Sequence, residues 1–154
     1  MIKCQKTIKI GILIIGLCLL TTLTLYKKDA YYEKEQTKQV AISFLKSLTK
    51  YDQESAIKYV LSNTQLDKDL KNPDKFLSFK DSKILGVIRV NEDSTEGRSK
   101  FYQAFYKIIS VVVKIKVVHT DDIGNPAGDY ILFITLVKKS PQSEWLITEL
   151  GSGP

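Results

Sequence analysis

His119 is the side chain best suited to acid–base chemistry, because it is the only histidine and Asp121 and Asp122 follow it closely. An imidazole oriented by a carboxylate is a common general base in enzymes. This group stands where an apolar segment gives way to turn residues, which is the wrong place for a buried base. No nucleophile-elbow motif and no phosphate-binding glycine loop accompanies it. We therefore interpret His119 as a surface residue and predict no catalytic residues.

Two acidic segments suggest calcium binding at first sight, Asn91–Gly97 and Asp121–Asn125. A calcium loop needs acids at alternate positions, a glycine in its middle and a late bidentate glutamate. Neither segment keeps that spacing, and ordinary hairpin turns use the same residue types. Cys4 and Cys18 are the only cysteines, so the rest of the chain can form neither a disulfide nor a thiolate zinc site. The sequence predicts no metal-binding or cofactor-binding residues and no cofactor.

Aromatic residues offer a third kind of chemistry, since eight tyrosines and Trp145 could line a ligand pocket. Large aromatic side chains at strand and helix spacing more often form part of the core. A core position is therefore our interpretation of Trp145, and a pocket for a small apolar ligand stays open as the alternative.

The elements that would position these residues begin with a long apolar run. Ile10–Tyr26 contains no charged residue, and about 17 to 25 such residues cross a bilayer as a helix. Lysines flank the run at both ends and can reach the headgroups. A cleaved signal peptide would need small residues at a cleavage site, and a lipoprotein would need one directly before Cys18. The run fits both alternatives less well than an uncleaved anchor that holds the chain in the lipid bilayer.

The orientation of this anchor can be inferred from its layout, in which a short basic tail comes directly before the apolar run, as in a signal peptide. Such segments usually leave the tail inside and export the rest of the chain. Lysines are similarly frequent near both ends of the run, so the positive-inside rule discriminates little. We expect a single-pass protein of the cell membrane with its domain outside.

The net charge of +6 at pH 7 does not indicate a nucleic-acid partner. Without Lys3, Lys6 and Lys9 of the N-terminal tail, 20 basic residues face 17 acidic residues, which leaves a net charge of +3. These positive charges are scattered among acids instead of clustering on one element. We therefore expect no nucleic-acid binding.

Apolar residues at helical spacing come after the anchor. Val40, Phe44 and Leu48 recur at every fourth position, which predicts an amphipathic helix over residues 31–49. Their common face should be buried against the rest of the domain.

Two further helical segments are marked by capping residues. Asp52 is a suitable N-cap for a helix over residues 53–61. A shorter helical stretch is expected between residues 64 and 79, where Asn72-Pro73 matches an N-cap followed by proline at the first helical position.

From residue 84 onward the pattern changes to the alternation of β-strands. It predicts four strands, over residues 84–90, 101–119, 130–138 and 145–150. In the second strand one face is apolar and the other is partly polar: Phe105, Ile109, Val111, Val113, Ile115 and Val117 against Tyr106, Ser110, Lys114 and Lys116. The third strand is apolar on both faces, which predicts a central position in the sheet.

Helices followed by strands that turns connect predict an α+β fold with an antiparallel sheet. Residues 1–28 should form a short basic tail and a transmembrane signal anchor. Residues 31–154 should form one α+β domain, a cone-like arrangement of three helices packed on a curved four-stranded sheet.

The chain resembles the uncharacterised family numbered 4829 among domains of unknown function, which is found in Gram-positive bacteria. The matching residues are Ala41-Ile42-Ser43-Phe44-Leu45, Ala56, Trp145-x-Ile147 and Gly151-Ser152-Gly153-Pro154, within residues 35–154. That family is similar to the nuclear-transport-factor-2-like (cystatin-like) superfamily, a cone of three helices on a bent sheet. The resemblance implies this fold and an exported, membrane-associated setting, and it implies no activity.

These features favour an extracytoplasmic, non-enzymatic module that binds a partner protein or a wall component. The alternative is a small-molecule-binding or enzymatic pocket of the cone fold. A buried ionisable residue on an apolar strand face would favour the alternative. The predicted strands show none there, which favours the binding module.

Overall fold

The computed structural model describes residues 28–94, 98–118 and 127–153. The chain divides into two compact units, Met1–Glu35 and Gln36–Pro154. His119, the Asp121–Asn125 segment and the predicted anchor Ile10–Tyr26 lie outside the described residues. Among the helices that are described, none combines the length and the apolar character needed to cross a membrane.

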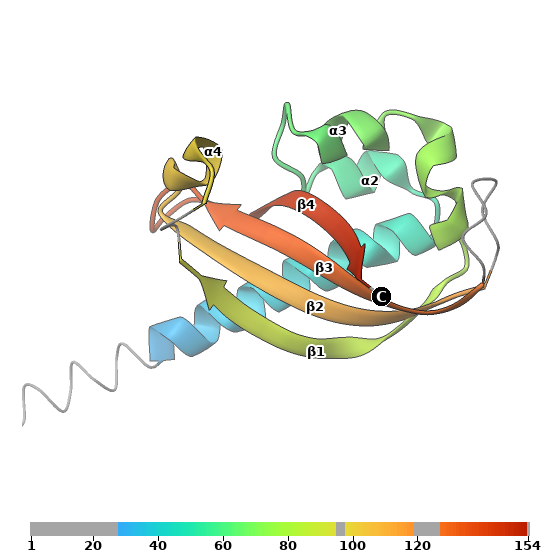
Figure 1. Cartoon of the computed structure of the whole chain (residues 1–154), viewed down its shortest axis with the longest axis horizontal. Coiled ribbons are helices and arrows are strands. Elements are labelled where there is room, and N and C mark those ends of the chain that lie inside the picture. The colour runs from blue at the N-terminus through green and yellow to red at the C-terminus, as the bar shows by residue number, and fades with distance from the viewer. Residues whose placement is uncertain (1–27, 95–97, 119–126, 154) are drawn as a thin grey trace, which may run out of the picture. The chain divides into compact units, whose positions relative to one another are not determined.

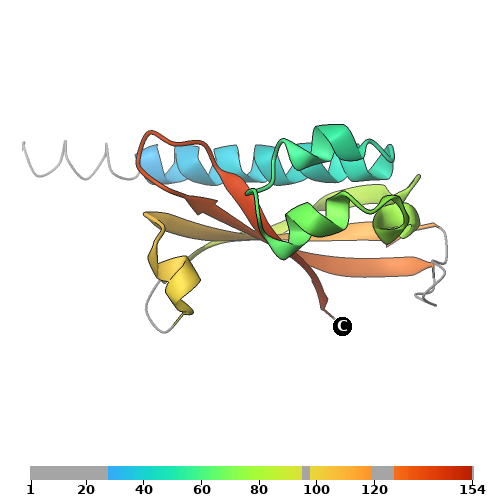
Figure 2. The same cartoon turned by 90° about the horizontal axis from the view of Figure 1, so that it is seen from above.

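The first helix runs over residues 28–49, and its prediction over residues 31–49 is confirmed. From residue 36 onward it lies across one face of the sheet (Figures 1 and 2). Phe44 and Leu48 of the predicted stripe are buried, together with Ala41 and Leu45. The helix ends where Tyr51 adopts a φ of 59°, which turns the chain out of the helical path.

Helix α2 (Gln53–Ile57) begins as predicted, since the Asp52 carboxylate accepts a hydrogen bond from Ser55 N over 3.0 Å. It ends four residues earlier than the predicted residue 61, so the second half of that prediction is wrong. The reason is tertiary: Leu61 N donates to Ile147 O and Ile147 N donates to Tyr59 O, each over 2.8 Å. These bonds form a parallel bridge that helical backbone cannot make.

Two short helices come next where one was predicted, α3 (Gln65–Leu70) and the 3-10 helix η1 (Pro73–Phe79). The predicted cap of the second is confirmed. Asn72 is the N-cap, its side chain accepts from Asp74 N over 3.1 Å, and Pro73 opens the helix.

The sheet contains four antiparallel strands in the order β1-β2-β3-β4, as predicted. The strands are β1 (Lys83–Asp93), β2 (Lys107–Val117), β3 (Gly128–Lys138) and β4 (Leu146–Gly153). The central position of the third strand is confirmed, since β3 lies between β2 and β4. Strand β1 continues through residues 91–93, beyond the predicted end at residue 90.

The predicted strand over residues 101–119 is wrong at its start. Lys100–Gln103 forms a helical turn, α4, and strand β2 begins only at Lys107. The rings of Phe101 and Phe105 lie 5.2 Å apart at helical spacing, and Arg98 stacks on Tyr102 at 5.1 Å. This aromatic packing needs a turn, because residues four apart lie next to each other on a helix and not on a strand.

Apolar residues gather on both faces of the sheet. The larger cluster joins the first helix, α2, α3 and η1 to one face of the strands and includes Ile109, Val111, Val113, Ile115 and Val117 of β2. The smaller cluster lies on the opposite face and consists of Leu61, Tyr102, Ile108 and Val137, with Phe105 and Leu146 against them. Phe105 was predicted on the face of Ile109, and it packs instead against the smaller cluster, to which α4 contributes Tyr102.

One ionisable side chain lies on an apolar strand face, so the prediction that there is none is wrong. Lys138 is 7% exposed and lies two residues after Leu136, on the same face of β3. Its ammonium nitrogen lies 5.6 Å from the ring centroid of Trp145. The cation–π contact and the apolar stem of the lysine offset part of the cost of burial.

Candidate functional site

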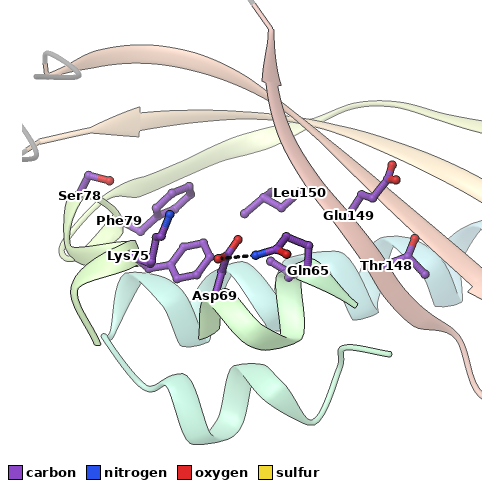
Figure 3. A pocket seen from close by; sticks show the side chains of 10 residues that line it. Gln65, Asp69, Lys75, Ser78, Phe79, Thr148, Glu149 and Leu150 are labelled. Atoms are coloured by element: carbon purple, nitrogen blue, oxygen red, sulfur yellow. Dashed lines mark hydrogen bonds between the residues drawn. The ribbon is translucent and has the colours of Figure 1, made fainter. Parts of the chain in front are cut away.

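A groove of about 370 Å³ runs between β4, α3 and η1, and it is the candidate site (Figure 3). Side chains of opposite charge and several apolar side chains line it together. The lining residues are Gln65, Leu66, Asp69, Lys75, Phe76, Ser78, Phe79, Thr148, Glu149 and Leu150.

The wall that β4 contributes consists of backbone as much as of side chains. Thr148, Glu149 and Leu150 are consecutive, and all three line the groove. The pairing of β4 with β3 shifts register at Thr148 and is regular from Glu149 onward, so the side chains of Glu149 and Leu150 point to opposite faces of the sheet and one face cannot present all three. The groove must therefore run along the edge of β4, where the backbone of every residue is reached. This edge is open because β4 is the last strand of the sheet.

Local capping positions the α3 wall. The Thr64 hydroxyl accepts a hydrogen bond from Asp67 N over 3.2 Å, and the Asp67 carboxylate accepts one from Asn63 N over 2.9 Å. The bond from Asn63 N and the ammonium of Lys71 hold the pKa of Asp67 below its ordinary value. This reciprocal cap fixes the start of α3.

Gln65 and Asp69 stand one turn apart on α3 and face the groove. The Gln65 amide donates to the Asp69 carboxylate over 3.0 Å, as Figure 3 shows. This bond holds one carboxylate oxygen of Asp69 next to the Gln65 side chain on the same helix.

The η1 wall is apolar at its base and charged at its rim. The rings of Phe76 and Phe79 lie 5.9 Å apart and pack on the larger core cluster. Lys75 is exposed at the rim. Asp81 N donates to Thr49 O over 2.9 Å, which ties the end of η1 to the first helix.

A second, smaller cavity of about 90 Å³ continues the groove toward the end of β4. Ser78 and Phe79 line both spaces. The other lining residues of this inner cavity are Ile115, Val117, Tyr130, Leu132 and Ser152. The site therefore changes along β4 from a wide, charged groove to a narrow, mainly apolar end.

A buried hydroxyl pair lies behind the β4 wall. Thr148 Oγ1 donates to Thr135 O over 3.3 Å, which leaves the Tyr102 hydroxyl as the donor to Thr148 Oγ1 over 3.2 Å. Burial raises the pKa of Tyr102 to about 12. At neutral pH this tyrosine keeps its proton and is a hydrogen-bond donor behind the groove wall.

The predicted core position of Trp145 is confirmed, since the residue is 5% exposed and belongs to the larger cluster. Trp145 lines neither the groove nor the inner cavity. Within the described ranges, its indole nitrogen is the one buried side-chain nitrogen or oxygen without a hydrogen-bond partner.

The described residues of the first acidic segment line neither the groove nor the inner cavity. Asp93 of the first segment lies in β1, where its carboxylate binds Arg98 over 2.9 Å and also accepts from the Ser110 hydroxyl. In the part of the chain that the structure describes, histidine, cysteine and acidic side chains form no group of three that could hold a metal ion.

No protein-family model and no curated protein matches the chain. An NTF-2-like protein of unknown function from Shewanella oneidensis MR-1, solved by crystallography, matches its structure with a TM-score of 0.50 and a sequence identity of 14%. The match covers 78% of this chain and 98% of that protein. The chain has an NTF-2-like fold. This fold and the α+β class were predicted, and both are confirmed at the level of the fold.

Sequence reasoning missed the groove of this NTF-2-like fold. Gln65, Asp69 and Lys75 are ordinary exposed helix residues in the sequence, and nothing in their spacing points to a site. The one available signal was the short final strand with its small residues Gly151 and Ser152, because an edge strand is a place where backbone stays reachable.

Proposed function

We propose that this chain is a membrane-anchored, non-catalytic binding module that holds a partner protein or a wall component in the groove along β4. The observation that carries this proposal is the groove itself, with its volume of about 370 Å³ and its rim of exposed polar residues. Gln65, Lys75 and Glu149 are all exposed. Groups at such positions can contact a large partner, whereas an enzyme usually encloses its reacting groups.

The anchored, extracytoplasmic setting is part of the proposal and is supported by the sequence. Ile10–Tyr26 is uncharged and long enough for a membrane span, and a short basic tail precedes it. Membership of the domain-of-unknown-function family numbered 4829 likewise stays a prediction. The resemblance to that family agrees with an exported domain.

The inner cavity supports a second candidate function, the binding of a small apolar molecule. It has a volume of about 90 Å³ and is lined by Phe79, Ile115, Val117 and Leu132, among others. A dry cavity of about 150 Å³ is known to hold benzene, so an occupant here would be smaller. An enzymatic pocket is the less supported form of this alternative, because the charged residues stand at the rim of the groove and outside this cavity. The buried Lys138 does not change this, since it lines neither the groove nor the cavity.

The setting can be tested by fractionation of cells that express the full chain. The protein should stay with the membranes after a carbonate wash and keep its full mass. Protease added to intact cells should remove the domain and spare a cytoplasmic marker. A secreted form whose N-terminus lies near Ala30 would overturn the anchor.

The groove can be tested by crosslinking on intact cells, followed by purification of the chain. Lys75→Glu reverses a charge at the rim, and Lys139→Glu makes the same change at an exposed position outside the groove. We expect Lys75→Glu to lose a crosslinked product that Lys139→Glu keeps. Equal crosslinking by both variants would contradict a partner in the groove.

A further inference from the structure

The backbone of β4 is the feature from which the kind of ligand can be inferred. Its outer edge is already used for strand pairing over a short distance. Residues 59–61 run parallel to β4 and exchange two hydrogen bonds with Ile147, each 2.8 Å long. This short ladder shows that the edge accepts an added strand.

The ladder stops because the chain turns away, and β4 continues without it. Asn63 adopts a φ of 66° and leads the chain into α3. Beyond Ile147, no strand of the described residues pairs with the outer edge of β4. The groove begins at this point, since Thr148, Glu149 and Leu150 line it and Ser152 lines the inner cavity.

From these observations we infer that the groove binds an extended peptide segment of a partner protein, which adds a strand to β4 at Thr148–Gly153. The inference rests on the proposed function and specifies how that function is carried out. Backbone hydrogen bonds to a sheet edge would supply affinity, and pockets for alternate side chains would supply selectivity. The ladder of residues 59–61 would be continued by the peptide.

The inner cavity specifies one side chain of the peptide. Side chains of an extended peptide alternate, so one of them can enter the cavity while its neighbours point away. The cavity is mainly apolar and holds about 90 Å³, which suits a short aliphatic side chain such as that of valine. Residues of either charge can lie next to it in the wider groove, because Asp69, Glu149 and Lys75 all line that part.

A peptide fits this edge better than a second copy of the chain. The open part of β4 has α3 and η1 beside it, as Figure 3 shows. Symmetric pairing of two β4 edges would bring the α3 and η1 of one copy toward those of the other. A single extended peptide has no such helices and can lie along the strand.

The inference can be tested with a phage-displayed library of random heptapeptides, selected on the full chain in detergent micelles. We expect enriched peptides to contain valine, isoleucine or threonine. Their binding should slow amide hydrogen exchange at residues 148–153 and leave β1 unchanged. No enrichment over empty micelles, or protection at another place, would overturn the inference. Dimers formed through β4 in the absence of peptide would favour a second copy as the occupant.

Backbone pairing is tested by N-methylation of alternate amides in a selected peptide. A strand donates to its neighbour from every second residue, so one methylated set should lose about tenfold or more in affinity and the other set should bind normally. If peptides of both methylated sets bind in the groove with unchanged affinity, strand addition is wrong. The proposed binding function would then still hold.

The inner cavity is tested by a matched pair of variants. Ser152→Phe places a ring at the cavity from an exposed position, and Leu85→Phe adds a ring at an exposed position on β1. We expect only Ser152→Phe to weaken the peptide, by about tenfold, because it takes the space of one aliphatic side chain. Equal affinities for both variants would contradict the assignment of a side chain to this cavity.

Discussion

The two edge strands of the sheet are built differently, and the difference concerns which edge can accept another strand. β1 pairs with β2 across two register shifts, between Ile84 and Gly86 and between Val87 and Arg89. From Glu149 to Gly153, β4 pairs with β3 residue by residue without a shift. Bulges twist an edge and interrupt the row of backbone groups that a further strand would need. β1 is therefore protected against pairing, and the second half of β4 is left open.

The side chains at the bulges of β1 strengthen this contrast. Leu85 and Ile88 lie at the two shifts and are 50% and 56% exposed. Exposed aliphatic residues on a regular edge strand would invite aggregation. Here the irregular backbone removes that hazard. β4 has one register shift of its own, at Thr148, and pairs regularly from Glu149 to Gly153. Beside this regular part, the helices restrict access to something as thin as a single peptide.

The largest expected effect concerns the start of β4, where Trp145 anchors the strand. Trp145→Ala should cost about 3 to 5 kcal/mol, as truncation of a buried tryptophan usually does. A domain of this size has a free energy of unfolding of about 5 to 15 kcal/mol, so the variant should be close to unfolding at physiological temperature. Urea denaturation of residues 31–154, followed by circular dichroism, checks this. The unaltered fragment should show one cooperative transition.

The matched change on the other edge is Leu85→Ala. Because Leu85 is half exposed, its truncation should change the free energy of unfolding by no more than about 0.5 kcal/mol. A stable Trp145→Ala protein that no longer binds its partner would show that the tryptophan is a contact residue. In that case the start of β4 would belong to the site and not to the core.

A second prediction concerns the hydroxyl pair behind the β4 wall. The pKa of Tyr102 rises from 10.0 to about 12 on folding because burial disfavours the phenolate. Above pH 10 the unfolded chain releases this proton while the folded chain keeps it, so stability is lost as the pH rises. A difference of two pKa units corresponds to a loss of about 2 to 3 kcal/mol between pH 10 and pH 12.

Tyr102→Phe isolates this contribution, because the variant has no proton to release at that position. It should be less stable than the unaltered fragment near neutral pH, by about 1 kcal/mol for the lost hydrogen bond. Its stability should then fall less steeply in alkali. Tyr106→Phe, at a position that is 57% exposed, serves as the control and should keep the alkaline slope. Parallel slopes for all three proteins would mean that Tyr102 titrates normally.

Local signals in the sequence were enough to predict most of this fold. The stripe of Phe44 and Leu48 lies on the buried face of the first helix, and Asp52 and Asn72 cap helices where expected. These features depend on neighbours within a few residues of each other. The prediction of a strand over residues 101–119 was wrong at its start, because Phe101 and Phe105 pack against each other as in a helical turn. This packing accompanies contacts with the smaller cluster, whose residues come from separate parts of the chain.

The groove could not be predicted in the same way, because its walls meet only after folding. Thr148, Glu149 and Leu150 read as an ordinary strand, and their common feature is an edge that no neighbour covers. The apolar pattern of β3 predicted a central strand, but the residues of β4 do not by themselves show that β4 is an edge. Lys138 was missed for a related reason, since its contact with the ring of Trp145 forms only on folding.

A pair of glycines provides the finest test of the difference between the two edges. Gly86 lies at a bulge of β1 with a φ of 155°, which other residues adopt only with strain. Gly151 lies in the regular part of β4, opposite Phe133. A Cβ added at either glycine meets no atom within 4 Å, so packing does not distinguish the two positions. Any difference between alanine variants therefore reports the backbone alone.

Gly86→Ala should lose about 1 to 2 kcal/mol, because alanine must be strained to keep the bulge. Gly151→Ala should be neutral or gain up to about 1 kcal/mol, since alanine lowers the entropy of the unfolded chain at a position whose backbone it can adopt. Urea denaturation of the two variants beside the unaltered fragment measures both changes. If both variants lose the same stability, the edge of β4 is as irregular as that of β1, and it would offer a peptide no straight row of backbone groups. If Gly86→Ala is the neutral one, the bulge that protects β1 is absent and β1 becomes the edge open to pairing.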